Sequence, residues 1–170
     1  LLNYESGAPA ALAGVTIRAI DSADGTLPLE AVRATISLSD DPHLAPTRLV
    51  CFENTHNACG GVVVPIDHMQ AVTGLARGLG LRTHLDGARL FNAVVSSGCS
   101  ARSYASSFDT ISICLSKGLG APVGSVLVGG RESMAVARRF RKMYGGGMRQ
   151  AGVIAAAGHF ALTHHVQRLT

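Results

Sequence analysis

Two short motifs carry the residue types of a covalent cofactor site. The first is Asp86-Gly87-Ala88-Arg89, and the second is Ser116-Lys117-Gly118-Leu119-Gly120. Each follows a short apolar run that is typical of a buried strand. An aspartate and a lysine at neighbouring strand ends can hold a pyridoxal phosphate (PLP) ring, the lysine as a Schiff base and the aspartate on the ring nitrogen. The two motifs therefore favour PLP chemistry.

The same residues also have structural interpretations. An aspartate directly before a helix is a good N-cap, and Arg89, three residues after Asp86, can pair with it. Lys117 is harder to explain in this way, because a solvent-exposed lysine does not need a turn between Ser116 and Gly118. Spacing alone therefore leaves both the cofactor site and the structural interpretation open.

Other catalytic and nucleotide-binding motifs are incomplete. The stretch Gly118-Leu119-Gly120 lacks the last glycine of G-x-G-x-x-G, and Lys117 precedes its glycines rather than ending a glycine loop. The chain has no G-x-S-x-G elbow and no H-E-x-x-H pair. We expect no metal site and buried free thiols, because the cysteines form no C-x-x-C pair and no histidine stands at zinc-like spacing. The four cysteines are Cys51, Cys59, Cys99 and Cys114.

The composition is that of a water-soluble protein with a sizeable core. Of its 170 residues, 47% are hydrophobic and 15% are charged, and no apolar run is long enough to span a bilayer. This length suits one domain, and we expect a cytoplasmic protein without a membrane partner. The sequence starts without an initiator methionine and ends without a Gly or Pro stop signal, so we expect a domain that is incomplete at both ends.

The positive charge is concentrated in one segment. The net charge is +4, and residues 131–149 hold six of the 15 Lys and Arg residues but one acid, Glu132. This segment has no interleaved aromatics and no nucleic-acid motif, so we expect no nucleic-acid partner. Val136, Phe140 and Met143 are spaced as an apolar helix stripe that would face the core. The cations then form either a solvated face or a site for a phosphate or carboxylate.

The hydrophobic pattern predicts strands that alternate with helices. The predicted strands are 15–20, 48–52, 81–85, 110–115 and 123–128, and the predicted helices are 28–36, 65–80, 88–95, 132–143 and 150–166. This alternation is typical of an α/β fold with a mainly parallel sheet flanked by helices. Ligands of such folds bind beyond the carboxyl ends of the strands, where Asp86 and Lys117 fall.

Four motifs, taken in order along the chain, closely resemble the low-specificity L-threonine aldolases. They are Glu53-Asn54-Thr55-His56-Asn57, the stretch 84–93 around Asp86, the stretch 116–125 around Lys117, and the stretch 141–150 that ends in Met148-Arg149-Gln150. Members of that family are PLP enzymes of fold type I, the aspartate-aminotransferase fold. The resemblance runs over essentially the whole chain. It implies that residues 1–170 are the PLP-binding large domain of such an enzyme.

The resemblance also implies a role for each matching residue. Lys117 would be the Schiff-base lysine, Asp86 would bind the pyridine nitrogen, and Arg89 would sit beside the ring and its 3′ oxygen. Ser116 would contact the phosphate of the cofactor. His56 would lie near the substrate hydroxyl, where it either handles a proton or orients and stacks on a ring.

Two cations complete the implied site. Arg149 would bind an anion, either the substrate carboxylate or the cofactor phosphate, and Lys142 would lie close by. Members of the family also carry an upstream phosphate-binding loop, a ring-stacking histidine and a C-terminal small domain outside the stretch matched here. The resemblance therefore implies that this piece binds PLP poorly, and it leaves open whether the piece is active by itself.

The implied activity is the retro-aldol cleavage of L-threonine or L-allo-threonine to glycine and acetaldehyde. The substrate would be a small amino acid, and the full-length protein would be a homo-oligomer, either a dimer or a tetramer. Two alternatives stay open. One is a related PLP lyase that acts by β-elimination. The other is a truncated or degenerate, inactive product that folds only in part or serves only as an interaction partner.

Overall fold

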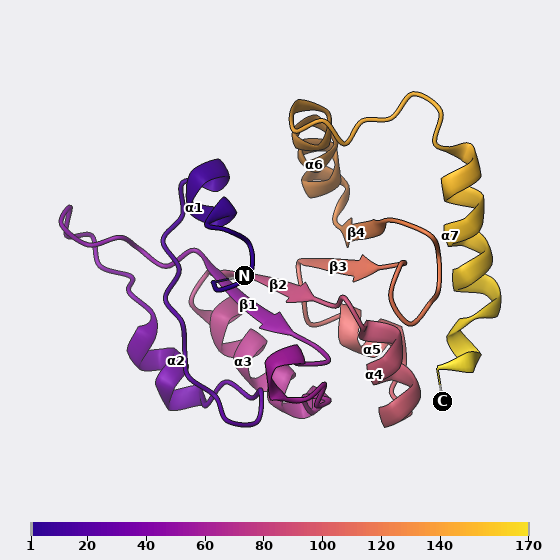
Figure 1. The fold of residues 1–170 in the computed structure, drawn as a ribbon. Helices are drawn as coiled ribbons and strands as arrows, with labels where there is room; N and C mark the ends of the chain where they lie inside the picture. Colours follow the sequence, from indigo (N-terminus) through magenta and orange to yellow (C-terminus); the bar gives the residue numbers. More distant parts are fainter. Residues whose placement is uncertain (1, 170) are drawn as a thin grey trace.

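The computed structural model describes residues 2–169 and contains one four-stranded sheet with helices on both sides (Figure 1). The strands are β1 (Leu49–Glu53), β2 (Arg82–Asp86), β3 (Thr110–Cys114) and β4 (Ser125–Gly129), and they lie in this order across the sheet. The first three strands are parallel, and β4 runs antiparallel to β3. The predicted α/β class with a mainly parallel sheet is confirmed. The sequence predicts a domain that is incomplete at both ends, and the terminal residues 1 and 170 lie outside the described residues.

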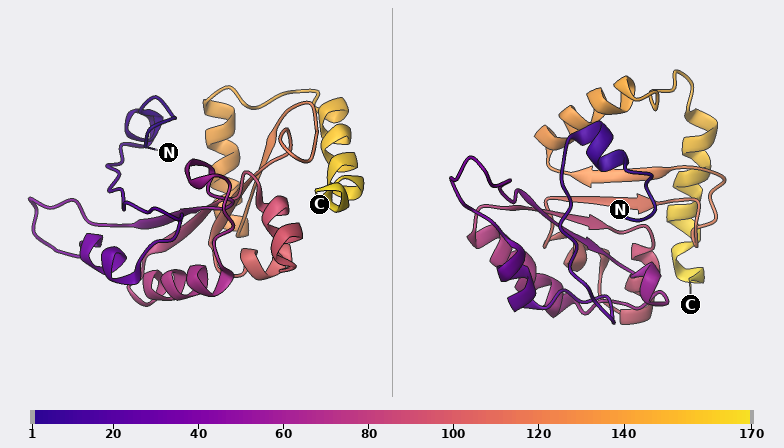
Figure 2. Two further views of the ribbon diagram at one scale, coloured as in Figure 1. Left: turned by 60° about the horizontal axis from the view of Figure 1, so that its bottom comes forward. Right: turned by 60° about the vertical axis from the view of Figure 1, so that its left-hand side comes forward.

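Helices connect the strands and cover the sheet. They are α1 (Ala8–Ala13), α2 (Leu29–Thr35), α3 (Ile66–Gly78), α4 (Leu90–Ser97), α5 (Ala101–Ala105), α6 (Arg131–Met143) and α7 (Gly152–His164), with 3₁₀ turns η1 (Asn57–Cys59) and η2 (Val166–Arg168). The left view of Figure 2 shows α2, α3 and α4 along one side of the sheet, with α1 and α6 on the other. Within residues 2–169, every helix is too short or too polar to cross a lipid bilayer.

The predicted strand at 15–20 is wrong, while the other predicted elements are present with bounds that differ by a few residues. Residues 15–20 form a loop that pairs with no strand, and Val15 and Ile17 are exposed. Arg18 in this loop donates hydrogen bonds to the carbonyls of Thr35 and Ala45, both at 3.1 Å. Alternating apolar residues favour a strand, but a strand also has to pair with a neighbouring strand. This segment pairs with none of the four strands.

The core lies between the sheet and the helices α3, α4 and α5. Successive side chains of a strand point to opposite faces, so each strand presents every second residue to the core. The core-facing members Phe52, Leu85 and Ile111 come from β1, β2 and β3, and they pack with Met69 and Tyr104. The opposite face of the same strands is polar and half-buried, and it carries Cys51, Glu53, His84, Asp86 and Ser112.

A smaller cluster joins the loop after β3 to α7. Leu119, Ala121 and Ala161 are buried in it, and Phe91 from α4 and Leu115 pack around them with Val166 and Leu169. The C-terminal helix is therefore attached to the chain next to the loop that carries Lys117.

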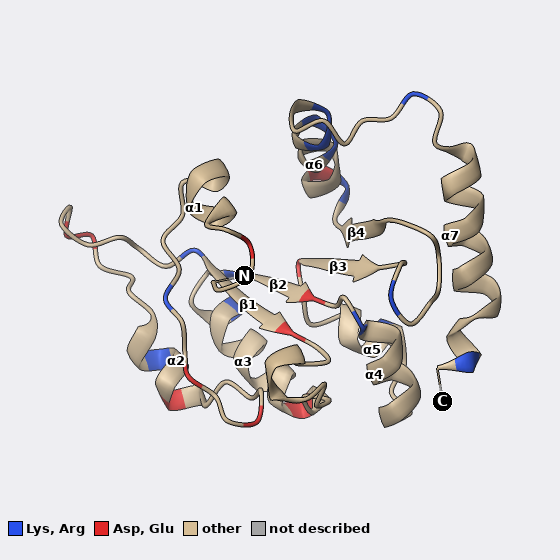
Figure 3. Cartoon of the chain, in the orientation of Figure 1, with Lys and Arg blue, Asp and Glu red and all other residues tan. Residues whose placement is uncertain are grey.

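The apolar stripe of α6 is exposed, so the prediction that it faces the core of this chain is wrong. Val136, Phe140 and Met143 are 53%, 47% and 69% exposed. The helix instead approaches the sheet through Met134, whose Cε lies 3.0 Å from the position that a Cβ on Gly129 would take. Figure 3 shows its many Lys and Arg residues in blue.

All four cysteines are free thiols, as predicted, but each is half-buried rather than buried. Burial raises the pKa of the Cys51 thiol to about 11, which keeps it protonated and unreactive at neutral pH. No group of three or more His, Cys, Asp or Glu residues within 2–169 is arranged to hold a metal ion.

Candidate active site

Three loops meet at the carboxyl ends of the parallel strands. In the sheet register, Glu53 at the end of β1 pairs with Asp86 at the end of β2, and Asp86 pairs with Ser112 of β3. Figure 3 shows the acidic ends of β1 and β2 as red arrow tips side by side. The loops that follow hold His56, Arg89 and Lys117. The structure therefore brings residues from three separate segments to one edge of the sheet.

Asp86 does not cap the helix that follows it. Its Oδ1 accepts a hydrogen bond from the Ala88 backbone N–H at 3.1 Å, and α4 begins four residues later with Arg89 in the N-cap position. Arg89 forms no ion pair with Asp86 in residues 2–169, so the second structural interpretation is also wrong. Within the same residues the Oδ2 atom has no hydrogen-bond partner. One carboxylate oxygen of this half-buried residue is therefore free to accept a hydrogen bond.

Gly87 allows the Asp86 turn to lie directly against β3. Its backbone N–H donates to the Ser112 carbonyl at 2.8 Å, and a Cβ on Gly87 would stand 3.0 Å from that oxygen and 3.1 Å from the Leu90 Cβ. Any larger residue would push the turn away from the strand. Glycine is therefore required here by the close approach of two backbones.

Lys117 lies on a tight turn between β3 and β4. The Gly120 N–H donates to the Lys117 carbonyl at 2.8 Å, and the Ala121 N–H donates to the Leu115 carbonyl at 2.9 Å. Gly120 adopts φ 71°, the left-handed region that favours glycine. Lys117 and Ser116 are exposed, and neither side chain forms a hydrogen bond with protein in residues 2–169. The turn thus presents an unpaired amine.

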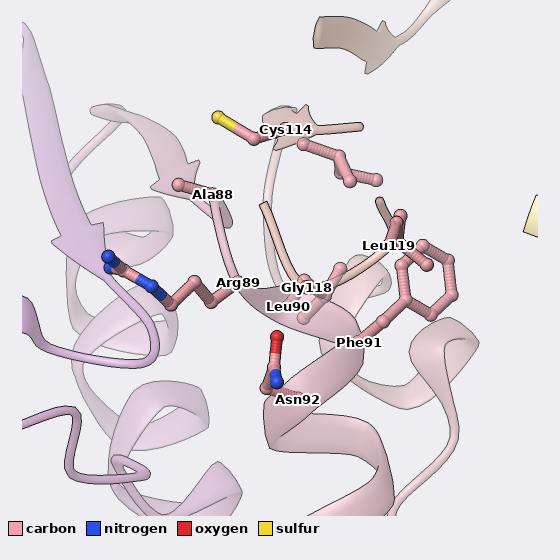
Figure 4. Close-up of a pocket in the computed structure, with 9 residues that line it drawn as sticks. Ala88, Arg89, Leu90, Phe91, Asn92, Cys114, Gly118 and Leu119 are labelled. Atoms are coloured by element: carbon pink, nitrogen blue, oxygen red, sulfur yellow. The ribbon is translucent and has the colours of Figure 1, made fainter. Parts of the chain in front are cut away.

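The Asp86 and Lys117 motifs form two walls of one crevice (Figure 4). It is lined by Ala88, Arg89, Leu90, Phe91, Asn92, Ile113, Cys114, Gly118 and Leu119. The space beside these residues, open solvent included, is about 170 Å³, and it is too narrow to enclose a ring. Figure 4 shows the Arg89 side chain pointing away from Phe91 and Leu119. A ring held by both motifs would therefore lie on the rim of this crevice.

His56 carries a buried ring nitrogen without a partner. Its backbone is fixed by two hydrogen bonds, from the His56 N–H to the Val62 carbonyl and from the Gly61 N–H to the His56 carbonyl, both at 2.9 Å. Within residues 2–169, Nδ1 is buried and forms no hydrogen bond. A buried polar atom without a partner costs about 1–3 kcal/mol and is unusual unless the residue has a functional role.

The first residues of the same motif have structural roles. Asn54 is fully buried, and its Oδ1 accepts from the Val64 backbone N–H at 3.1 Å. Glu53 Oε1 accepts from the Asn57 backbone N–H at 3.0 Å. These contacts hold the loop that carries His56 in a single shape.

Two histidines beside the site were not singled out by the sequence motifs. His84 lies two residues before Asp86 on the same face of β2, and its Nδ1 is 2.8 Å from Thr110 Oγ1. Burial lowers the pKa of His84, and the nearby charge of Asp86 opposes that shift. His165 contacts the Lys117 turn through Leu119. A histidine next to a strand or helix end carries no recognisable spacing signal, so only the fold shows these contacts.

Arg149 lies apart in the exposed loop between α6 and α7. None of the hydrogen bonds or ion pairs within residues 2–169 joins it to Asp86, Lys117 or His56. The same holds for Lys142, which is exposed on α6. The anion-binding role of Arg149, with Lys142 close by, stays a prediction.

The fold places this chain among known α/β proteins. A threonine aldolase from Leishmania major superposes with a TM-score of 0.85 at 21% identity, over 98% of this chain and 48% of that one. At this level of identity the likeness shows the fold alone. The class that fold and site define is an α/β protein with a candidate covalent-cofactor site at its parallel strand ends.

The comparisons by sequence identify the family. Residues 1–170 match the family model described as beta-eliminating lyase, and the chain belongs to this family. It is 48% identical over 167 residues to the low specificity L-threonine aldolase of Escherichia coli (strain K12), covering 98% of this chain and 49% of that protein. It is 41% identical to the low-specificity L-threonine aldolase 1 of Arabidopsis thaliana, covering 47% of that protein. The chain thus spans about half the length of these curated relatives.

Proposed function

We propose that this chain is the cofactor-binding part of a PLP-dependent enzyme that cleaves L-threonine or L-allo-threonine to glycine and acetaldehyde. The observation that carries the proposal is that one end of the sheet holds both a lysine amine and a carboxylate oxygen that have no hydrogen-bond partner within residues 2–169. They come from turns that form two walls of one crevice. The names of relatives at 48% and 41% identity support the reaction.

The residues of this site fit the chemistry of PLP. When bound, PLP withdraws electrons from the bond that breaks at the substrate Cα. The Asp86 Oδ2 would accept a hydrogen bond from the ring nitrogen and stabilise positive charge there. The Lys117 amine would hold the cofactor covalently, and Arg89 and Ser116 would contact its oxygens.

We assign to His56 the transfer of a proton from the substrate hydroxyl. Its Nδ1 is buried and has no protein partner within residues 2–169, so the hydrogen-bonding capacity of this nitrogen is unused. A histidine within hydrogen-bond distance of a hydroxyl can take its proton near neutral pH. We assign Arg149 to the anionic groups of substrate or cofactor, since it is an exposed cation in the loop before α7.

The chain contains two lysines, Lys117 and Lys142, which makes the covalent step easy to test. The protein is incubated with PLP, reduced with borohydride and digested, and the labelled peptide is identified by mass spectrometry. We expect the label on Lys117, its loss in Lys117→Ala and its retention in Lys142→Ala. A label on Lys142 alone, or no label on Lys117 at saturating PLP, would refute the proposed site.

A second candidate is β-elimination on a β-substituted amino acid, which the family description favours. Both reactions would use Lys117 and Asp86, so product analysis has to separate them. Retro-aldol cleavage of threonine yields an aldehyde and glycine, whereas elimination yields a keto acid, ammonia and the released β-substituent. A chain that binds PLP at Lys117 and forms neither product would support the remaining alternative, a cofactor-binding part that does not turn over by itself.

We further propose that the working protein is a homo-oligomer in the cytoplasm. The family resemblance supports the assembly, and the exposed apolar side chains of α6 are consistent with it. Sedimentation of the purified chain tests the oligomeric state directly.

A further inference from the structure

The C-terminal helix is packed tightly onto the turn that carries Lys117. Gly158 of α7 is buried, and a Cβ there would lie 2.9 Å from the Leu115 Cδ1. A Cβ on Gly118 would lie 2.9 Å from the Leu169 Cδ2, just beyond η2. Because there is no room for a methyl group at either glycine, α7 and η2 contact the turn directly on both sides of Lys117.

His165 makes the polar contact in this apolar interface. Its Nδ1 lies 2.7 Å from the Leu119 carbonyl oxygen. A carbonyl only accepts, so Nδ1 carries the hydrogen and donates it. Phe160 meets the ring edge-on, with ring centroids 5.3 Å apart at 89°, and helps to fix its orientation. The bond persists in either charge state of the imidazole, because Nδ1 also donates when the ring is protonated.

The accepting carbonyl belongs to the part of the turn that sets the direction of Lys117. Leu119 is buried two residues after Lys117, and the next residue, Gly120, donates its N–H to the Lys117 carbonyl at 2.8 Å. A bond that holds the Leu119 carbonyl therefore also fixes the peptide group that closes the turn. On the other side of the turn, Gly118 packs against the Asn92 side chain of α4. A Cβ on Gly118 would lie 3.1 Å from the Asn92 Oδ1.

We propose that His165 is a positioning residue, which holds the turn between α7 and α4 so that the Lys117 amine faces the Asp86 carboxylate. The role of Lys117 in this statement depends on the proposed function. The attachment of the turn by His165 does not, so the two can be tested separately.

The chain offers closely matched variants. His165→Asn keeps a donor at the position of Nδ1, whereas His165→Leu keeps the bulk and removes the donor. The adjacent His164 is exposed, contacts Phe160 with ring centroids 4.4 Å apart and the rings tilted by 44°, and has no hydrogen bond to protein within residues 2–169. His164→Leu is therefore the control for the loss of a histidine at the end of α7.

Two readouts are measured on the purified full chain. The first is amide hydrogen exchange of residues 115–121, which reports on the turn without any cofactor. The second is the PLP concentration that half-saturates the borohydride-fixed label on Lys117. In His165→Leu we expect exchange of the Gly120 and Ala121 amides to become about tenfold faster and half-saturation to need about tenfold more PLP. His165→Asn and His164→Leu should match the parent.

Each outcome decides between the claims. Unchanged exchange in His165→Leu overturns the positioning role, and so does faster exchange with unchanged labelling at Lys117. Failure of His165→Asn to restore both readouts also overturns it, because packing alone would then explain the effect. Faster exchange in His165→Leu, together with a parent that never labels Lys117, supports the attachment of the turn and refutes the proposed function.

Discussion

The two carboxylate oxygens of Asp86 have different roles, one in the local structure and one in the proposed chemistry. Oδ1 accepts the Ala88 N–H and shapes the turn after β2, while Oδ2 has no protein partner within residues 2–169. A substitution to alanine removes both oxygens, so a loss of turnover in that variant could come from a distorted turn or from the lost charge. Asparagine keeps a carbonyl oxygen for the turn and removes only the negative charge.

We therefore expect Asp86→Asn to take up PLP at Lys117 and to lose most of its turnover, about a hundredfold or more. The reason is that a neutral amide does not stabilise a protonated ring nitrogen as a carboxylate does. Labelling with borohydride and the rate of aldehyde release from threonine measure the two effects. Asp40→Asn, in an exposed loop, is the control. Parental turnover in Asp86→Asn would remove Asp86 from the proposed mechanism.

One aspartate joins β2 to β3 at the end of these strands that lies away from the candidate site. Asp109, directly before β3, accepts at Oδ2 from the Thr83 backbone N–H at 2.8 Å and at Oδ1 from Arg82 at 3.0 Å. Its own N–H donates to the Thr83 carbonyl at 3.1 Å. Burial by itself would raise the pKa of Asp109, but the hydrogen bonds from Thr83 and Arg82 outweigh it and hold that pKa below the ordinary 3.8.

We expect Asp109→Asn to lower the free energy of unfolding by about 1 kcal/mol at pH 7, since charge-assisted hydrogen bonds are lost. The folded-state pKa of Asp109 is the lower one, so its contribution is complete above the unfolded value near 3.8 and disappears as pH falls through the folded value. Urea unfolding of both proteins at pH 7 and below pH 3.8 measures this. A difference that stays constant across this range would contradict the assignment.

At the scale of the whole molecule, one side of α6 exposes apolar side chains, although the rest of the helix is rich in Lys and Arg. No residue of this helix is buried, and Val136, Phe140 and Tyr144 are 53%, 47% and 52% exposed along one side. Phe140 and Tyr144 stack with ring centroids 6.0 Å apart. All residues of the edge strand β4 are exposed as well. Apolar surface of this kind commonly marks an interface between protein chains.

We expect the purified chain to self-associate, and Phe140→Glu to shift it toward monomer, because a charge in an apolar interface is costly. Sedimentation velocity over a range of protein concentrations measures the shift. The control is Ala71→Glu, which adds the same charge at an exposed position of α3. A parent that is monomeric at all concentrations would show that α6 is not an interface between copies of this chain.

The sequence by itself determined the strands, most helices and the two motifs at the strand ends. Period-two and period-3.6 patterns are local, and they assign residues to faces wherever one face is buried. Parallel strands then bring their carboxyl ends together, so the shared edge of Asp86 and Lys117 follows from the element order.

Only the tertiary structure decided which surfaces are covered and which polar atoms are paired. It showed that the stripe of α6 and residues 15–19 are exposed within residues 2–169, although their patterns resemble core elements, and that Ile20 alone of the predicted strand packs against the core. It also showed the free Oδ2 of Asp86, the unpaired Nδ1 of His56 and the contact of His165 with Leu119. The physical reason is that hydrogen bonding and burial depend on neighbours distant in the chain, and no local periodicity encodes them.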